Sequence, residues 1–367
     1  LDLKNRVMTS ASDSTTLSRR IGWGLRGALI TADVLLSTAC HSLFLLLLKP
    51  LMCRLLGRED LYWRIEGFLF ERIFGHVATW THTAGYRLCL HGDAIPSQAY
   101  SSRTLVICNH VSTADVPTLF YLWVNSHPCP IPNLWWVMDM LFKWTPFGWV
   151  SQVHRDHFIL QGKETRQGTL AEFSRSVART YLQLPRNWCV IFPEGGFHYK
   201  RIAASNRFAE KHGLPPMDHV TYPRVGAIYA FAEALRTASP ADGAGLDYII
   251  DMTIGYQDNK PHGLDDIVLG WSKSSTVHVN QRVFNVSKDA VPLESSDELL
   301  TWLYSRWQEK NSQLDEFYRT GEFPTTRHCP VEFHWPNIIL GYLVSAGYIY
   351  LMYRLVCFVF VVFGLLF

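Results

Sequence analysis

Two long apolar stretches near the ends of the chain constrain its fold more than any other feature. Residues 21–50 are mostly apolar and are interrupted by Asp33 and His41, and residues 336–367 are apolar almost throughout, broken by Arg354. A helix that crosses the hydrocarbon core of a bilayer needs about 20 such residues. The sequence therefore predicts an N-terminal membrane helix and a C-terminal membrane segment. The second segment is long enough for one tilted helix or two shorter elements.

The composition agrees with a membrane-associated chain. Hydrophobic residues make up 48% of the 367 residues and charged residues 18%, whereas about 25% charged is usual for soluble domains. The formal net charge of +2 gives no support to a nucleic-acid partner. None of the eight cysteines forms a Cys-x2-Cys pair, so we expect reduced, buried thiols and no metal site.

Between the apolar ends the chain divides into three parts. Residues 1–20 are polar and rich in Ser and Thr, which is typical of a poorly ordered leader. Residues 51–85 mix aromatic and charged side chains, which fits an amphipathic interfacial helix or, equally, an aromatic-rich core helix. Residues 86–325 are expected to form the main folded domain.

Strand-like and helix-like segments alternate in this domain. Strands are expected over residues 86–90, 104–108, 188–192, 248–254 and 276–284, and helices over residues 167–182, 201–211 and 226–236. A longer helix is expected to follow a cap at Ser295 and to stop at Gly321. Residues 238–245 look like a surface insertion. The alternation predicts an α/β fold with helices flanking a sheet.

One strand ends at a pair of residues that suits acid–base chemistry. The apolar residues 104–108 are followed by Asn and then His110, and Asp115 stands five positions after that histidine. A neutral imidazole can accept a proton from a hydroxyl. Asp115 could hold its other ring nitrogen if His110 lies in a turn, and Ser112 and Thr113 are good caps for a helix that starts there. A capped helix start with an incidental histidine is the alternative.

A second strand ends at Phe-Pro followed by Glu194, Gly195 and Gly196. Paired glycines allow a ligand to approach the backbone closely, so an exposed glutamate beside them suggests a site for a polar substrate head or for backbone amides. Arg224 follows another Tyr-Pro pair, and arginine suits phosphate through two parallel hydrogen bonds. Taken singly, an ordinary turn and a surface arginine are the alternatives.

Taken in order, these blocks resemble the PlsC-like glycerophospholipid acyltransferase family. The blocks are Asn109-His110 with Asp115, Pro146-Phe147-Gly148 with Phe158-Ile159, Phe192-Pro193-Glu194-Gly195, and Pro223-Arg224. The resemblance covers about residues 40–325 and is strongest to the lysophosphatidylglycerol acyltransferase branch. It implies a mixed sheet flanked by helices, with membrane helices at both ends.

The resemblance also implies the activity: transfer of an acyl group from acyl-CoA to the hydroxyl of a lysophospholipid. His110 would act as general base and Asp115 would orient it. Acyl-CoA is a co-substrate, and no cofactor or metal is implied. The implied location is the endoplasmic reticulum membrane, and the basic loop before the C-terminal segment places the domain in the cytosol. Substrate binding is implied for Asn109, Glu194, Gly195, Gly196, Arg224, Lys200 and Arg201.

Two departures from the family pattern bear on the acceptor. Residues 160–161 are Leu-Gln where relatives usually carry an arginine, so either the charge is absent or another residue supplies it: Arg155, Lys163 or Arg166. Phe197 stands where relatives with a phosphomonoester acceptor have an arginine. The second departure favours a phosphodiester acceptor such as lysophosphatidylglycerol or lysophosphatidylethanolamine.

Three other functions fit the same sequence. The chain could acylate a monoacylglycerol, or it could be a transacylase that needs no CoA thioester. It could also be a membrane-anchored lipid-binding protein that kept the fold without the activity.

Overall fold

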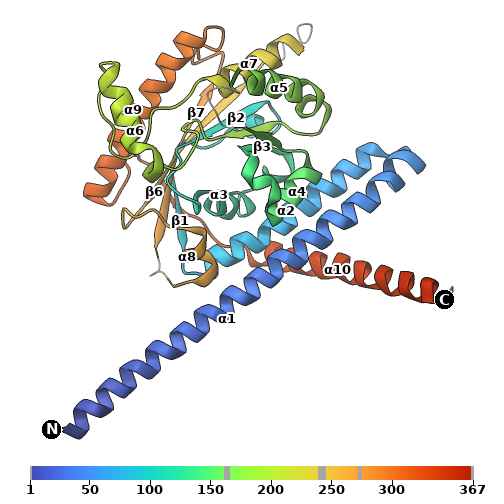
Figure 1. The fold of residues 1–367 in the computed structure, drawn as a ribbon. Coiled ribbons are helices and arrows are strands. Elements are labelled where there is room, and N and C mark those ends of the chain that lie inside the picture. Colours follow the sequence, from blue (N-terminus) through green and yellow to red (C-terminus); the bar gives the residue numbers. More distant parts are fainter. Residues whose placement is uncertain (1, 161–165, 239–244, 272–274, 365–367) are drawn as a thin grey trace.

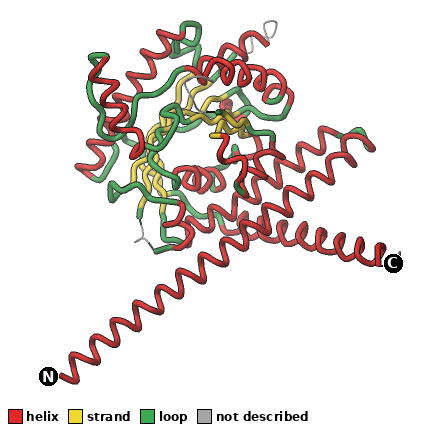
Figure 2. The backbone as a smooth tube through the Cα atoms, viewed as in Figure 1, coloured by secondary structure: helices red, strands yellow, loops and turns green. Residues whose placement is uncertain are grey.

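An eight-stranded mixed sheet forms the centre of the structure, and two long helices project from one side of it (Figures 1 and 2). The computed structural model describes residues 2–160, 166–238, 245–271 and 275–364. The predicted class, a mixed sheet flanked by helices, is confirmed.

The strands lie in the order β4-β3-β5-β2-β6-β7-β1-β8. Their bounds are β1 Arg87–Gly92, β2 Thr104–Cys108, β3 Leu134–Asp139, β4 His157–Ile159, β5 Trp188–Ile191, β6 Tyr248–Tyr256, β7 Thr276–Asn285 and β8 His328–Pro330. The first five strands in this order run parallel, β7 runs antiparallel to β6, and β1 is parallel to β7. The carboxyl ends of β2, β3, β5 and β6 therefore meet at one edge, where ligands bind in open α/β sheets.

Beside several short 3₁₀ and π helices, ten α-helices lie within the described residues. They are α1 Asp2–Lys49, α2 Glu59–Thr83, α3 Asp115–Val124, α4 Pro146–His154, α5 Arg166–Arg179, α6 His198–Lys211, α7 Gly226–Ala238, α8 Leu264–Leu269, α9 Ser296–Thr320 and α10 Trp335–Gly364. As predicted, α9 is capped by the Ser295 side chain and ends at Gly321. Part of the expected surface insertion, residues 239–244, lies outside the described residues.

Each face of the sheet is covered by its own set of helices. On β2, Val106 and Cys108 belong to the core shared with α2 and α3, whereas Leu105 and Ile107 belong to the core shared with α5, α7 and α9. All five residues of β2 are buried, which explains why this strand is an uninterrupted apolar run. β2 thus lies at the centre of the domain, and its end is held firmly.

The helix α2 is buried along most of its length and packs against α3 and α10. Phe74 stacks on Phe120 of α3, with ring centroids 3.7 Å apart, and Phe70 stacks on His154 at 3.5 Å. Of the two alternatives for residues 51–85, the structure favours the core helix over the interfacial one. The aromatic side chains of α2 pack in the core between the helices and the sheet.

The end segments form helices that are long and apolar enough to cross a bilayer, over Leu17–Leu55 and Trp335–Val362. The second is one continuous helix in its described part rather than two elements. The expected disordered leader is helical instead, because α1 begins at Asp2. No Gly or Pro occurs in residues 2–21, so nothing stops the helix from extending out of the apolar stretch.

Polar contacts fasten the two long helices to the domain. Asp33 of α1 accepts hydrogen bonds from His76 at 3.0 Å and from the indole N–H of Trp80 at 3.2 Å, both on α2. The other ring nitrogen of His76 lies 3.0 Å from the hydroxyl of Ser345 on α10. Arg26 donates to the carbonyl oxygens of Trp80 and Ile267. The interruption of the first apolar stretch at Asp33 is thus a joint between three helices.

Candidate active site

His110 and Asp115 meet at the carboxyl end of β2. The turn between β2 and α3 brings His110 Nδ1 within 2.8 Å of Asp115 Oδ2. The aspartate side chain is fully buried and the histidine side chain is 14% exposed. Because the carboxylate faces Nδ1, the neutral ring carries its proton there, and the lone pair lies on Nε2.

Two further donors complete the surroundings of the aspartate. The backbone N–H of Ser112 donates to Oδ2 at 2.9 Å, and the hydroxyl of Tyr256 donates to Oδ1 at 2.7 Å. Tyr256 is the last residue of β6 and is fully buried. Burial, together with the negative charge of Asp115, raises its pKa well above the usual value of 10. The hydroxyl is therefore a permanent donor that helps to fix the carboxylate.

The other side of the His110 ring is apolar. The ring stacks on Phe192, with centroids 4.1 Å apart, and meets the edge of Phe197 at 4.5 Å. Among the described residues none forms a hydrogen bond with His110 Nε2. The ring is thus held on three sides while Nε2 stays available to an incoming hydroxyl.

Asn109 does a different task from the one implied by the sequence. Its side chain is buried, its Nδ2 donates to the carbonyl oxygen of Ile254 at 3.0 Å, and its Oδ1 accepts from the N–H of Ile254 at 2.7 Å. These bonds extend the pairing of β2 with β6 beyond the last residue of β2. The geometry gives Asn109 a positioning role for His110 rather than a substrate contact.

The predicted exposure of Glu194 is wrong, because its side chain is fully buried. Its carboxylate accepts from the N–H of His110 at 3.0 Å, from Trp307 Nε1 at 3.3 Å, and from Thr221 twice, through the N–H at 3.0 Å and the hydroxyl at 2.6 Å. Burial raises the pKa of Glu194, and the bonds from Thr221 and His110 oppose that rise. The glutamate cross-links the site from within; Thr221 and Trp307 carry no local motif that marks them.

Gly195 and Gly196 form a tight turn between two arginines. Their φ values are 67° and 155°, and residues other than glycine rarely adopt such positive values. A Cβ on Gly195 would lie 3.3 Å from Arg224 Nη1, and one on Gly196 would lie 2.9 Å from Arg201 Cδ. Arg201 Nη1 also donates to the carbonyl oxygen of Gly195 at 3.0 Å. The turn must be made of glycine for the guanidinium groups to lie this close.

The basic side chains predicted near the site do gather around this turn. Arg224 is exposed, and its backbone N–H donates to the carbonyl oxygen of Pro193 at 2.9 Å. Lys200 is exposed, with its ammonium 5.4 Å from the centre of the Phe197 ring. Phe197 in turn touches His110. An anionic group bound here would lie within reach of the His–Asp pair.

Two of the three residues that could replace the missing arginine at positions 160–161 lie within the described residues. Arg155 caps the end of α4 with a φ of 67°, Arg166 begins α5, and Lys163 lies outside the described residues.

An apolar rim borders the same edge of the sheet. A short 3₁₀ helix over Met140–Trp144 directly follows β3, whose carboxyl end lies beside that of β5. Leu141 and Trp144 are 80% and 78% exposed, and Phe142 is also exposed. Neighbouring exposed apolar side chains form a patch of the kind that marks interaction with a membrane or a partner, so this rim fits contact with lipid.

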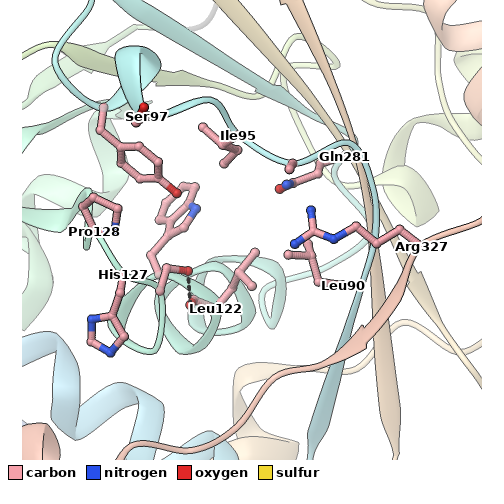
Figure 3. Close-up of a pocket in the computed structure, with 12 residues that line it drawn as sticks. Leu90, Ile95, Ser97, Leu122, His127, Pro128, Gln281 and Arg327 are labelled. Atoms are coloured by element: carbon pink, nitrogen blue, oxygen red, sulfur yellow. Dashed lines mark hydrogen bonds between the residues drawn. The ribbon is translucent and has the colours of Figure 1, made fainter.

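A cavity of about 390 Å³ lies elsewhere, between β1, β7 and the far end of α3 (Figure 3). Leu90, Leu122 and Gln281 line it, and Arg327 points toward it. Since α3 begins at Asp115 and Leu122 lies near its other end, the cavity is separated from His110 by most of that helix. The His–Asp pair and this cavity are therefore separate features of the structure.

Comparisons with known proteins match most of the chain, including the residues of this site. The family model for the acyltransferase domain matches residues 87–229, and the model for the acyltransferase C-terminus matches residues 266–340. Acyl-CoA:lysophosphatidylglycerol acyltransferase 1 of Mus musculus is 35% identical, with 89% of this chain and 92% of the relative covered. The Homo sapiens protein of that name is also 35% identical, with 90% and 94% covered. Lysocardiolipin acyltransferase 1 of Mus musculus is 28% identical, with 64% and 58% covered.

Proposed function

This chain belongs to the PlsC-like glycerophospholipid acyltransferase family, and from that premise we propose that it transfers an acyl group from acyl-CoA to the hydroxyl of a lysophospholipid. The observation that carries the proposal is the bond between His110 Nδ1 and Asp115 Oδ2, 2.8 Å long, which leaves Nε2 available at the active edge of the sheet. Lysophosphatidylglycerol and lysophosphatidylethanolamine are the favoured acceptors, and the process served is phospholipid remodelling.

The His–Asp pair supplies general base catalysis in this mechanism. His110 Nε2 takes the proton of the acceptor hydroxyl while the hydroxyl oxygen attacks the thioester carbonyl. Asp115 stabilises the imidazolium that forms. When the intermediate collapses, the C–S bond breaks and the imidazolium returns the proton to the CoA sulfur. The thioester is already activated, so neither a covalent acyl-enzyme nor a cofactor is required.

The turn at Gly195 and Gly196 suits the phosphate of the acceptor. Arg224 and Arg201 lie against the turn, and Lys200 stands nearby. A guanidinium group can donate two parallel hydrogen bonds to the oxygens of one phosphate. A phosphodiester bound there needs fewer cations than a phosphomonoester, which agrees with Phe197 at the position where many relatives with a phosphomonoester acceptor have an arginine.

The membrane helices and the apolar rim support a lipid acceptor taken from a bilayer. Two helices that are long and apolar enough to cross a bilayer support a membrane location. We place the protein in the endoplasmic reticulum, and the basic residues that precede the C-terminal apolar helix favour a cytosolic domain. The exposed Leu141 and Trp144 would touch the bilayer surface on the side of the site.

Acyl transfer by purified full-length protein tests the proposal. Labelled oleoyl-CoA would be offered with lysophosphatidylglycerol, lysophosphatidylethanolamine and a monoacylglycerol, and a phospholipid donor without CoA thioester would be offered separately. Loss of the base in His110→Ala should reduce transfer about 10²- to 10⁴-fold. His212→Ala is the matched control, since His212 is exposed at the end of α6.

The possible results separate the candidate functions. Transfer from acyl-CoA to a lysophospholipid that His110→Ala loses would support the proposal. Transfer only from the phospholipid donor would favour a transacylase, and transfer only to monoacylglycerol would favour that acceptor class. Lipid binding without any turnover would favour the binding protein.

A further inference from the structure

Four side chains of the types that bind transition metals in proteins meet on one face of the sheet, well away from His110. Cys89 and His91 are two residues apart on β1 and so face the same side. His278 of β7 lies opposite Cys89, and His328 of β8 lies opposite His91. β7, β1 and β8 are two, three and four strands removed from β2. The cluster is therefore separate from the catalytic site.

The ligand atoms are already close to the spacing that a metal ion requires. Cys89 Sγ lies 3.4 Å from Nδ1 and 3.3 Å from Nε2 of His328. Cys89, His91 and His328 can each offer one atom so that all three atoms lie within 4.8 Å of one another. Bond lengths to zinc of about 2.3 Å for sulfur and about 2.1 Å for nitrogen put ligand atoms of a tetrahedral site roughly 3.3 to 3.6 Å apart.

The fourth side chain holds one of these three in place. His278 Nδ1 shares a hydrogen bond of 2.9 Å with His91 Nε2, so the other nitrogen of His91 is the one that can face an ion. Histidine ligands of metals usually bond a neighbouring group through their second nitrogen, which fixes the ring. The pairing therefore orients His91 as a ligand.

Burial and access also suit a bound ion. Cys89, His91 and His278 are buried, and Phe317 and Phe323 pack against the imidazoles from the α9 side. His328 is exposed at the edge of the sheet. An ion could reach the cluster past this residue, while the rest of the site is closed by apolar rings.

We propose that Cys89, His91 and His328 bind a zinc ion and that His278 orients His91. One thiolate and two imidazoles form a donor set typical of zinc, with the fourth position left to water. Binding displaces the thiol proton of Cys89 to solvent. The three ligands lie on β1 and β8, and the short β8 leads directly to α10. The ion would thus clamp the linker of the C-terminal membrane helix onto the sheet.

The spacing along the chain hides this site, and the expectation of no metal arose for that reason. Cys89 and His328 are 239 positions apart, so no short motif of the Cys-x2-Cys kind connects them. Only the pairing of β8 with β1 brings them together.

Metal binding by the full-length protein tests the proposal. After exposure to Zn²⁺ and removal of the excess, the wild type should retain one zinc ion per chain. The zinc content is measured by elemental mass spectrometry. Co²⁺ in its place should give the near-ultraviolet charge-transfer band of a cysteine–cobalt bond. His278→Gln should weaken binding about 10- to 100-fold, and Cys89→Ser and His328→Ala should weaken it further.

A matched control lies on the same strand. Cys329 is next to His328, but it pairs with Leu90 and so faces the other side of the sheet; Cys329→Ser should bind zinc like the wild type. Zinc should raise the unfolding temperature of the wild type and of Cys329→Ser but not that of His328→Ala. Because His328 is exposed, its replacement should leave the metal-free fold intact, which size-exclusion chromatography checks. Absence of the cobalt band in the wild type, or equal zinc binding by the wild type and His328→Ala, would overturn the proposal and leave a metal-free histidine cluster.

Discussion

At the scale of single residues, the site depends on side chains that orient His110 through hydrogen bonds. Tyr256 touches Asp115, and Asp115 touches His110. Replacing Tyr256 with Phe removes a hydrogen bond to a charged carboxylate, which is worth about 1.5 to 3 kcal/mol. We expect kcat to fall about tenfold or more while the KM for acyl-CoA is unchanged, measured by steady-state kinetics.

The control for this change is Tyr121→Phe. Tyr121 is equally buried on α3, but its hydroxyl bonds His82 and not the aspartate. If both variants lose the same fraction of kcat, the effect belongs to packing and not to the orientation of Asp115.

The glycine turn gives a second prediction at this scale. In Gly196→Ala the new Cβ would meet Arg201 at 2.9 Å, at a φ of 155°, and such strain costs about 1 to 3 kcal/mol. We expect the KM for the lysophospholipid to rise about tenfold, because Arg201 must move. Gly213→Ala shares a positive φ at the end of α6 but has open space around it, so its KM should match the wild type. An unchanged KM in Gly196→Ala would separate the turn from acceptor binding.

Residue types alone could not separate substrate contacts from internal supports. The sequence places His110 and Asp115 correctly beside each other, because a five-residue turn leaves few other arrangements. Asn109 and Glu194 have the same polar chemistry as a substrate contact, yet their groups are bonded to Ile254 and to His110, Thr221 and Trp307. Tyr256 lies 141 positions from its partner, and no local pattern could reveal it.

At the scale of helices and strands, a buried ion-pair triad connects elements that the sequence leaves separate. Glu66 of α2 bonds His154 of α4 at 2.6 Å and Arg186 at 2.7 Å, just before β5. Burial alone would raise the pKa of Glu66, but the charges of His154 and Arg186 outweigh burial and hold it at about 2. The triad joins the helix layer to the sheet.

Breaking this triad should destabilise the protein. Glu66→Gln leaves Arg186 buried without its charge partner, which costs about 3 to 5 kcal/mol. A lowered carboxyl pKa adds stability above the ordinary value of 4.5, and that stability is lost as the pH falls from 4.5 toward 2. The unfolding temperature of the wild type should therefore drop over this range more than that of Glu66→Gln.

An exposed pair provides the comparison. Glu172 and Arg175 form an ion pair on the surface of α5, and exposed pairs contribute little. Glu172→Gln should unfold like the wild type in the same scan. Equal behaviour of the two variants would contradict a stabilising role for the triad.

Element prediction succeeded where a strand is a continuous apolar run and failed where it is short. β2 matches its expected bounds residue by residue, because both of its faces are buried. β4 and β8 contain three residues each, too few for any periodicity, and they exist because a neighbouring strand offers free backbone groups. β3 is longer, but it mixes aromatic residues with Met and Asp, and this composition does not predict a strand by its periodicity.

At the scale of the whole molecule, the apolar rim gives a prediction about the bilayer. Leu141 and Trp144 are exposed beside the edge of the sheet where the strands' carboxyl ends meet. Burying one such side chain lowers the free energy by about 1.5 to 3 kcal/mol. Leu141→Ser with Trp144→Ser should raise the KM for a lysophospholipid held in vesicles about tenfold or more. The kinetics with a short-chain, water-soluble acceptor should stay unchanged. Phe208→Ser, an exposed residue on α6, is the control, and the same KM for all three proteins would remove the rim from lipid contact.

The joint of Asp33, His76 and Ser345 limits how the enzyme can sample its surroundings. A domain on a loose tether could tilt and collect lipids at many depths. Here α1 and α10 are bonded to α2, and α2 is buried against α3, whose first residue is Asp115. The height of His110 above the bilayer is then set by the helices themselves. The proposed acyl transfer would then draw its acceptor from one leaflet, and the supply of acceptor to that leaflet would limit the rate.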